Sequence, residues 1–154
     1  LDCKEYNTSH TAVTWETCSL RKWLNNDFIN AAFSANEKAM IPTVTVSAYK
    51  NPKYKRGNPG NITQDQVFLL SVQEVEQYFD SLSARQCKPT DYAVANSAWE
   101  SDSGNCVWWL RSPGYTQNRA ATVYYEGRVH ELGHSVNNVH LTVRPALWID
   151  LNLV

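Results

Sequence analysis

Three histidines and one glutamate in the last third of the chain have the spacing of a zinc-protease motif. The string HELGH at residues 130–134 matches H-E-x-x-H, and His140 stands where a longer form of the pattern has its third histidine. In such sites the histidines bind zinc, and the glutamate is the general base that activates the zinc-bound water. One hypothesis is therefore a zinc-dependent metalloprotease that uses His130, Glu131, His134 and His140.

Zinc chemistry requires this motif to lie on a helix. One helical turn brings residues four apart to roughly 6 Å. In a strand, at about 3.3 Å per residue, His130 and His134 would be about 13 Å apart, too far for one zinc at about 2.0 Å from each nitrogen. The preceding residues favour strand and turn, because VYYEGRV at 123–129 is typical of a hairpin with its turn at Glu126-Gly127. The local sequence thus predicts the geometry that cannot hold zinc.

Two departures from the longer zinc pattern point the same way. Asn137 replaces the glycine of the pattern, and only fourteen residues follow His140. The sole methionine, Met40, precedes the motif, so no methionine turn can follow the third histidine. We therefore predict that the chain is not an enzyme and that it holds no metal and no cofactor.

Length and composition predict one domain with its own core. The chain has 154 residues, 43% of them hydrophobic, and we expect residues 1–154 to fold as a single domain. Fourteen basic and fifteen acidic side chains give a net charge of -1, which provides no basic field for nucleic acid. No run of 18 apolar residues occurs, so no membrane insertion is expected. The first residue is Leu1, and we expect the chain to be the C-terminal part of a longer protein.

The four cysteines give no metal or redox motif. They are Cys3, Cys18, Cys87 and Cys106, and no two of them form a C-x-x-C pair. Three disulfide pairings are possible, and the sequence does not choose among them. Buried free thiols are equally compatible with a core of this size.

Apolar periodicity and turn residues divide the chain into short elements. The predicted helices are residues 20–33 with a cap at Ser19, a short helix from the Ser34–Glu37 capping box to near Pro42, residues 72–79 after the Ser71–Glu74 capping box, and a short turn at 92–95. The predicted strands are 12–15, 43–47, 67–70, the buried run 106–110 and the hairpin 123–129, with an apolar closing segment at 143–151. Residues 49–64 are predicted to form a solvated loop that carries the basic residues Lys50, Lys53, Lys55 and Arg56.

Large apolar and arginine side chains near the predicted central strand have expected structural roles. We assign Trp108, Trp109, Leu110 and Trp148 to the core. Arg111 and Arg144 are expected to hold loops through backbone carbonyls.

Four ordered segments resemble a known family. They are WETCSLRKWLN at 15–25, VFLLS at 67–71, WWLRSPG at 108–114 and VRPALWI at 143–149. In this order they resemble a bacterial domain of otherwise unknown function, common in gut Gram-positive bacteria. That domain is similar to the variable proteins of diversity-generating retroelements and, more distantly, to formylglycine-generating enzymes. The resemblance covers almost the whole chain.

The resemblance implies an α+β, C-type-lectin-like fold with a twisted antiparallel sheet, flanking helices and long loops. It also implies a ligand-binding or display domain whose hypervariable face is diversified by a retroelement. The matching ligand-binding positions are Tyr115, Arg119, Thr122, Tyr124, Tyr125, Arg128, His130, Leu132, His134 and His140. The histidine motif would then be one draw from a diversified library. The implied partner is a protein or glycan on a target surface, and the implied location is a cell surface or a phage particle.

The residues alone agree in part with a binding face. Six Trp and eight Tyr stand against four Phe, and Tyr, Arg and His on hairpins and loops are typical of binding surfaces. An ordinary half-buried hairpin with solvated histidines explains the same residues equally well. A third class, an oxidase like the formylglycine-generating enzymes, rests on fold resemblance alone. Calcium-dependent sugar binding lacks its usual Glu-Pro-Asn or Gln-Pro-Asp string.

Overall fold

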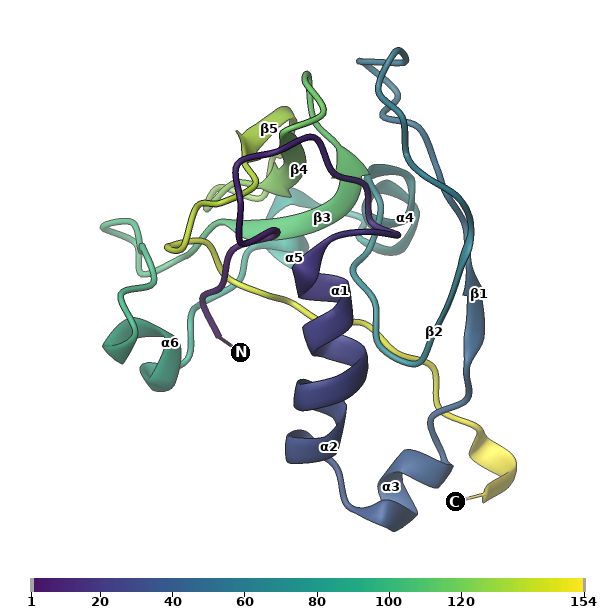
Figure 1. Ribbon diagram of the computed structural model, residues 1–154. Helices are drawn as coiled ribbons and strands as arrows, with labels where there is room; N and C mark the ends of the chain where they lie inside the picture. Colours follow the sequence, from purple (N-terminus) through teal and green to yellow (C-terminus); the bar gives the residue numbers. More distant parts are fainter. Residues whose placement is uncertain (1, 154) are drawn as a thin grey trace.

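The computed structural model describes residues 2–153 and has a mixed α+β architecture with two small antiparallel sheets (Figure 1). Its elements in chain order are α1 (Ser19–Trp23), η1 (Leu24–Phe28), α2 (Ile29–Ala32), α3 (Ala35–Ala39), β1 (Val44–Val46), β2 (Thr63–Asp65), α4 (Val72–Tyr78), α5 (Leu82–Arg85), α6 (Asp91–Ala95), β3 (Trp108–Pro113), β4 (Arg119–Val123), β5 (Val129–Ser135) and η2 (Leu151–Leu153). Long connections link these short elements, so the α+β prediction with flanking helices and long loops is confirmed at this level.

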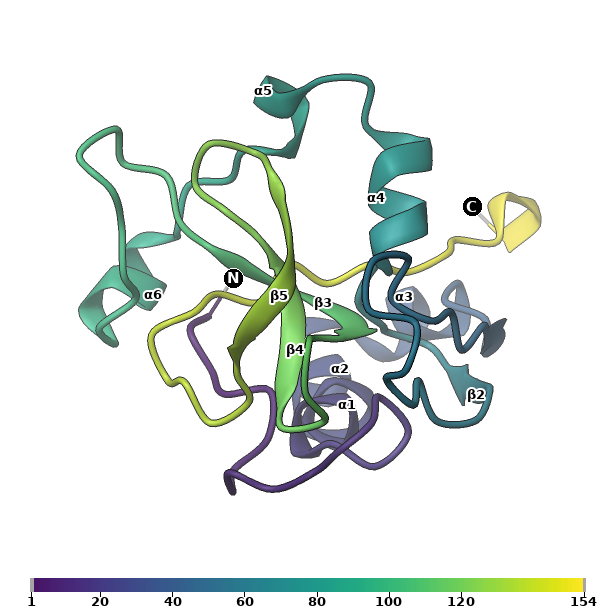
Figure 2. The same ribbon diagram turned by 90° about the horizontal axis from the view of Figure 1, so that it is seen from above.

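The main sheet is an antiparallel meander of β3, β4 and β5, seen from above in Figure 2. Trp109 of β3 is paired with Thr122 of β4, and Val123 of β4 is paired with Val129 of β5. On the other side of β3, the Trp109 amide donates to the Thr142 carbonyl at 3.1 Å. The strand predicted at 106–110 is therefore flanked on both sides, and all six residues of β3 are buried.

The two faces of this sheet carry two separate cores. On one face, Leu20 and Leu24 of the long helix belong to the same buried cluster as Trp109. On the other face, Val72 and Val75 of α4 pack with Trp108. Figures 1 and 2 show the long helix and α4 on different sides of the sheet. Alternate residues of β3 thus serve opposite cores, as the two-residue period of a strand requires.

Both buried tryptophans also satisfy their polar atoms. The indole Nε1 of Trp109 donates to the Lys4 carbonyl at 2.8 Å, and that of Trp108 donates to the Arg85 carbonyl at 3.0 Å. The predicted core roles of Trp108, Trp109 and Leu110 are confirmed, since all three have no exposed surface. Trp148 is different, because it is 54% exposed. Its core assignment is wrong: the closing segment is buried at Val143 and bridged to Phe68 at Ala146, and it reaches the surface at Trp148.

The predicted helix over 20–33 is confirmed as one helical run from Ser19 to Ala32. Its middle five residues, η1, are π-helical. The cap is Cys18 rather than Ser19, because the Cys18 sulfur accepts the Arg21 amide at 3.4 Å. The Ser19 hydroxyl instead accepts from the Thr8 amide at 3.0 Å.

Both predicted capping boxes are present. Ser34 and Glu37 exchange side-chain and backbone hydrogen bonds at the start of α3, and Ser71 and Glu74 do so at α4. Glu74 also forms an ion pair with Arg111, whose guanidinium donates to the Leu69 carbonyl at 2.8 Å. The expected loop-holding role of Arg111 is thereby confirmed, with an ion pair in addition.

Three segments differ from their predicted structure. Residues 12–15 form no strand: the buried Trp15 is held instead through its indole, which donates to Asp65 at 3.0 Å. Residues 67–70 contribute a single bridge rather than a strand. The predicted loop 49–64 ends in β2, which pairs antiparallel with β1 in the predicted strand 43–47. Side-chain hydrogen bonds to Asp65 from Trp15 and from Arg21 (2.7 Å) fix β2, and local sequence patterns do not encode such contacts.

All four cysteines are free thiols. Cys18 and Cys106 are buried, and Cys3 and Cys87 are half-buried. The Cys106 amide donates to the Cys87 carbonyl at 2.8 Å, which places these two residues side by side.

Among residues 2–153, no helix has both the length and the apolar character needed to cross a membrane.

Candidate functional site on the β4–β5 hairpin

The histidine motif lies on a strand. His130 and His134 are both in β5, which is paired along its length with β4. The connecting turn closes where the Tyr124 amide donates to the Arg128 carbonyl at 2.8 Å. Gly127 has φ +89° in this turn, and a Cβ there would overlap the Leu82 carbonyl. The hairpin and its turn are as predicted, and the helical premise of the protease hypothesis is not met.

The separation predicted for the two histidines is nevertheless wrong. Their ring centroids are 5.1 Å apart, not about 13 Å. The register explains the difference, because His130 pairs with Thr122 whereas His134 pairs with Ala120. Between these two pairs lie one residue of β4 and three of β5, and the excess of two residues is taken up around Gly133, which has φ +76°. This bulge brings both imidazoles together.

The paired histidines belong to a larger aromatic cluster. Tyr124 stacks on His130 with centroids 4.4 Å apart and meets His134 edge-on at 5.6 Å. Tyr125 lies 6.4 Å from Tyr124, and Trp99 lies 5.6 Å from Tyr125. We call Trp99, Tyr124, Tyr125, His130 and His134 the aromatic cluster. It is built from the hairpin and from a loop that precedes it by more than twenty residues.

Trp99 reaches the cluster because its backbone is tied to the segment after β5. Its amide donates to the His140 carbonyl at 2.9 Å, and the His140 Nδ1 lies 2.8 Å from the Ser97 carbonyl. His140 therefore anchors the loop that carries Trp99. Sequence reasoning missed Trp99, because no periodicity or motif marks it. The only available signal was an isolated tryptophan in a polar loop.

Burial keeps both histidines of the cluster neutral near pH 7. Desolvation lowers the pKa of His130, and it lowers that of His134 to about 4, with further contributions from His130 and Arg119. The Nδ1 of His134 lies 3.1 Å from the Thr122 hydroxyl. The Nδ1 of His130 is buried and has no hydrogen-bond partner within residues 2–153. The pair thus presents uncharged imidazoles beside the tyrosines.

The cluster borders a hollow of about 550 Å³, which lies in the size range of small-molecule sites. It is lined by Trp99, Val107, Tyr124, Tyr125, Glu126, His134, Asn138, His140 and Leu141. Glu126 and Asn138 were not predicted as site residues. They lie in the hairpin turn and in the loop after β5, which the sequence marks only as connections.

The structure divides the ten predicted ligand-binding residues. Four of them line the hollow: Tyr124, Tyr125, His134 and His140. His130 is adjacent to the hollow, because its ring centroid lies 5.1 Å from that of His134. Tyr124, Tyr125, His130 and His134 were expected on an exposed face, but all four are half-buried, whereas His140 is exposed. The structure therefore gives a partly enclosed site.

The other five predicted residues lie elsewhere. Thr122 is completely buried and cannot contact a ligand directly, so its placement on the face is wrong; it supports His134 instead. Arg119 is half-buried and donates to the Gly133 carbonyl at 2.8 Å. Arg128 is exposed on the turn but does not line the hollow.

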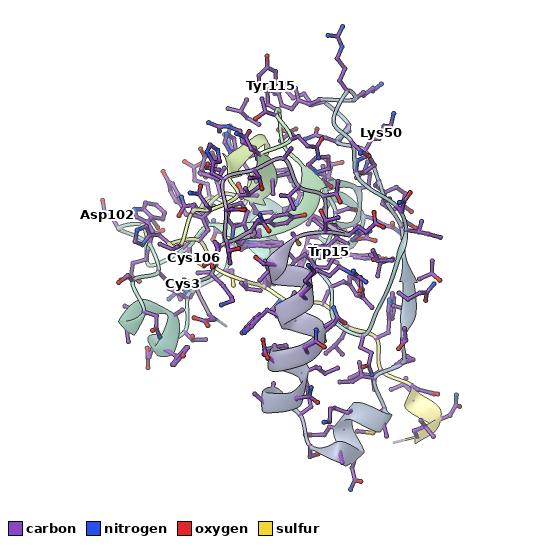
Figure 3. The ribbon with its side chains drawn as sticks, viewed as in Figure 1. Cys3, Trp15, Lys50, Asp102, Cys106 and Tyr115 are labelled. Atoms are coloured by element: carbon purple, nitrogen blue, oxygen red, sulfur yellow. The ribbon has the colours of Figure 1, made fainter. Side chains whose placement is uncertain are left out.

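Tyr115 and Leu132 form a second exposed patch. Tyr115 is 60% exposed, lies edge-on to Tyr54 at 5.0 Å, and donates its amide to the Leu132 carbonyl at 2.9 Å. Figure 3 shows Tyr115 and Lys50 toward one end of the molecule, and Asp102 at another edge. The predicted face thus comprises two patches, of which only the aromatic cluster borders the hollow.

The surroundings of the histidine pair determine whether it could bind a metal ion. Within the part of the chain that the structure describes, residues 2–153, no three His, Cys, Asp or Glu side chains are grouped to hold a metal ion. The Glu131 backbone carbonyl accepts from the Asn51 side chain at 2.8 Å, and the His140 ring is engaged with Ser97. The arrangement offers two neighbouring imidazoles without the further ligands that zinc uses in proteins.

Residues 1–151 match the family described as a domain of unknown function, DUF6273. The chain therefore belongs to this family. No curated protein and no solved structure matches it. Because the match spans nearly the whole chain, it includes the hairpin and both loops around the hollow, and their function must be argued from their geometry.

Proposed function

We propose that this chain is a ligand-binding domain of C-type-lectin-like fold whose binding site is the hollow beside the aromatic cluster. The observation that carries the proposal is the partly open hollow of about 550 Å³, walled by Trp99, Tyr124 and Tyr125. Large aromatic side chains on loops above a rigid sheet are typical of recognition sites. The partner is a protein or glycan on a target surface.

The distribution of burial supports a variable face on a fixed scaffold. Ala120, Ala121, Val123 and Val136 are buried, and Gly133 cannot accept a side chain because a Cβ would overlap the Ala120 carbonyl. Between these fixed positions stand the half-exposed residues of the hairpin. Such an alternation lets the face change while the core stays constant, as a domain diversified by a retroelement requires. A role on a cell surface or a phage particle is proposed from the family resemblance alone.

One observation favours the alternative, a zinc-dependent metalloprotease. His130 and His134 are close enough, at 5.1 Å between ring centroids, to share an ion. Their strand context and the absence of a third grouped ligand in residues 2–153 count against it. The Gly133 bulge explains the proximity without a metal. We therefore rank binding above hydrolysis.

The experiment is a binding screen with variants. The purified chain is applied to a glycan array and to an array of bacterial surface proteins. The strongest ligand is then measured against Trp99→Ala, Tyr125→Ala and Trp148→Ala. Truncation of a central aromatic contact typically costs about 2 kcal/mol, so the first two variants should bind roughly 30-fold more weakly.

Trp148→Ala is the matched control, because Trp148 is 54% exposed and lines a different hollow of about 260 Å³. It should bind as the wild type does. Thermal melting establishes that each variant is folded. Binding that survives the loss of Trp99 and Tyr125, or that depends on Trp148, would place the site elsewhere.

A further inference from the structure

The charges around the hollow favour one kind of ligand. Among residues 2–153, no lysine or arginine lines it, and the only carboxylate on its wall is that of Glu126. Glu126, through a hydrogen bond and its negative charge, raises the pKa of the neighbouring Tyr125, and Asp102 adds a smaller contribution of the same sign. An anionic ligand would meet the Glu126 carboxylate here, and a cation would be attracted.

The aromatic walls meet at steep angles. The rings of Trp99 and Tyr125 are 5.6 Å apart and inclined at 55°, and those of Tyr124 and Tyr125 are 6.4 Å apart and inclined at 59°. Rings at such angles do not stack on one another. His130 covers one face of Tyr124 at 4.4 Å, which leaves the other face of Tyr124 and the faces of Trp99 and Tyr125 for a guest. Each face carries the negative part of the ring quadrupole, which attracts a cation.

Among the described residues, the neighbouring basic groups place no positive charge on the wall of the hollow near pH 7. Desolvation keeps His134 neutral near pH 7, since its pKa is lowered to about 4. The Arg119 guanidinium is engaged by the Gly133 carbonyl at 2.8 Å, and neither Arg119 nor Arg128 lines the hollow.

We propose that the hollow binds a quaternary ammonium group, held between the faces of Trp99, Tyr124 and Tyr125 and neutralised by Glu126. This inference rests on the proposed function, because it names the chemistry that the same site recognises. Aromatic walls with a nearby carboxylate provide cation–π attraction and charge compensation for a group that cannot donate hydrogen bonds. Such a group occurs in phosphocholine and in trimethyllysine. The Glu126 carboxylate favours trimethyllysine, because it lacks the phosphate.

The test uses NMR of the whole chain with small probes. Tetramethylammonium and choline are titrated while the indole N–H signals are followed, and the signal of Trp99 is assigned by its loss in Trp99→Leu. The uncharged isostere of choline, 3,3-dimethylbutan-1-ol, measures binding that depends on shape alone. Phosphocholine and a trimethyllysine peptide distinguish the two sources.

The Trp99 signal should shift saturably with both cations, and the uncharged isostere should bind roughly tenfold more weakly. Glu126→Gln should weaken choline binding about threefold, and Trp99→Leu should abolish it. Trp148→Leu should leave it unchanged. The trimethyllysine peptide should bind more tightly than phosphocholine.

Equal binding of choline and its isostere, or the absence of any cation-induced shift at Trp99, would overturn the inference. The inference would also be overturned if a sugar from the glycan array shifted the Trp99 signal and none of the quaternary ammonium probes did. In each of these cases the proposed function still holds if the array ligand requires Trp99 and Tyr125. The proposed function fails separately if the array ligand binds equally well to Trp99→Ala and Tyr125→Ala.

Discussion

Acidification should destabilise the domain through His134, whose pKa is lowered from 6.5 to about 4, first by burial and then by His130 and Arg119. The folded state therefore takes up a proton at His134 less readily than the unfolded state. Between about pH 6.5 and pH 4 the unfolded state binds more protons, so stability present above pH 6.5 is lost as the pH falls. Below about pH 4 both states are protonated and this loss is complete.

The magnitude follows from the shift. At pH 5, pKa values of 6.5 unfolded and about 4 folded correspond to roughly 2 kcal/mol. Because the His134 side chain is only half-buried, solvent screening reduces this to about 1 kcal/mol. His130 adds a loss of the same sign, since burial lowers its pKa as well.

The assay is urea unfolding at pH 7.5 and pH 5.0 for the wild type, His134→Gln and His10→Gln. The wild type should lose more free energy of unfolding on acidification than His134→Gln, by about 1 kcal/mol. His10 is exposed and lies outside the pair, so His10→Gln should respond to pH as the wild type does. If the wild type and His134→Gln lose the same free energy, the desolvation argument for this histidine is refuted.

Four further results are expected. Trp109→Ala should cost about 3–5 kcal/mol in urea unfolding, because it removes a fully buried indole; a cost below about 1 kcal/mol would contradict its core position. Gly133→Ala should destabilise the fold by more than the roughly 1 kcal/mol of a backbone change alone and should broaden the NMR signals of β5, because the added Cβ overlaps a carbonyl of β4; a fully stable variant would show that the bulge is absent. Iodoacetamide should modify Cys87 before the other thiols, and faster above about pH 6, as measured by mass spectrometry. A hydrogen bond from Cys106 and the charge of Arg144 lower the pKa of Cys87 to about 6, although its partial burial opposes this. First reaction at another cysteine would contradict this. Elemental analysis after dialysis should find no stoichiometric zinc, and about one zinc per chain that is lost in His134→Ala would favour the hydrolase.

Elements whose signals are local could be predicted from the sequence. The Ser34–Glu37 and Ser71–Glu74 capping boxes need only residues three positions apart, and both form. The long helix follows from its apolar spacing, and the hairpin turn follows from the glycine at 127, which adopts φ +89°. The buried β3 run follows from its continuous apolar residues. In each case a few neighbouring residues determine the backbone.

The site itself depends on contacts that no local pattern encodes. The predicted separation of the two histidines was wrong, because it assumed a regular strand and the bulge at Gly133 depends on the register with β4. Trp99 was missed because it reaches the cluster only through its hydrogen bond to the His140 carbonyl. Thr122 was placed on the face because the family resemblance matches it to a variable position, but it is completely buried in β4, where it pairs with Trp109. Long-range pairing therefore decided which predicted residues meet.

The central claim, that the hollow beside the aromatic cluster is the binding site, is tested most directly by mapping. Amide chemical shifts of the whole chain are recorded with and without the strongest ligand from the arrays. The largest changes should fall at Trp99, at residues 124–126 and at Asn138 and His140, which line the hollow. Changes concentrated on the basic loop from Lys50 to Arg56, or around Trp148, would contradict the claim.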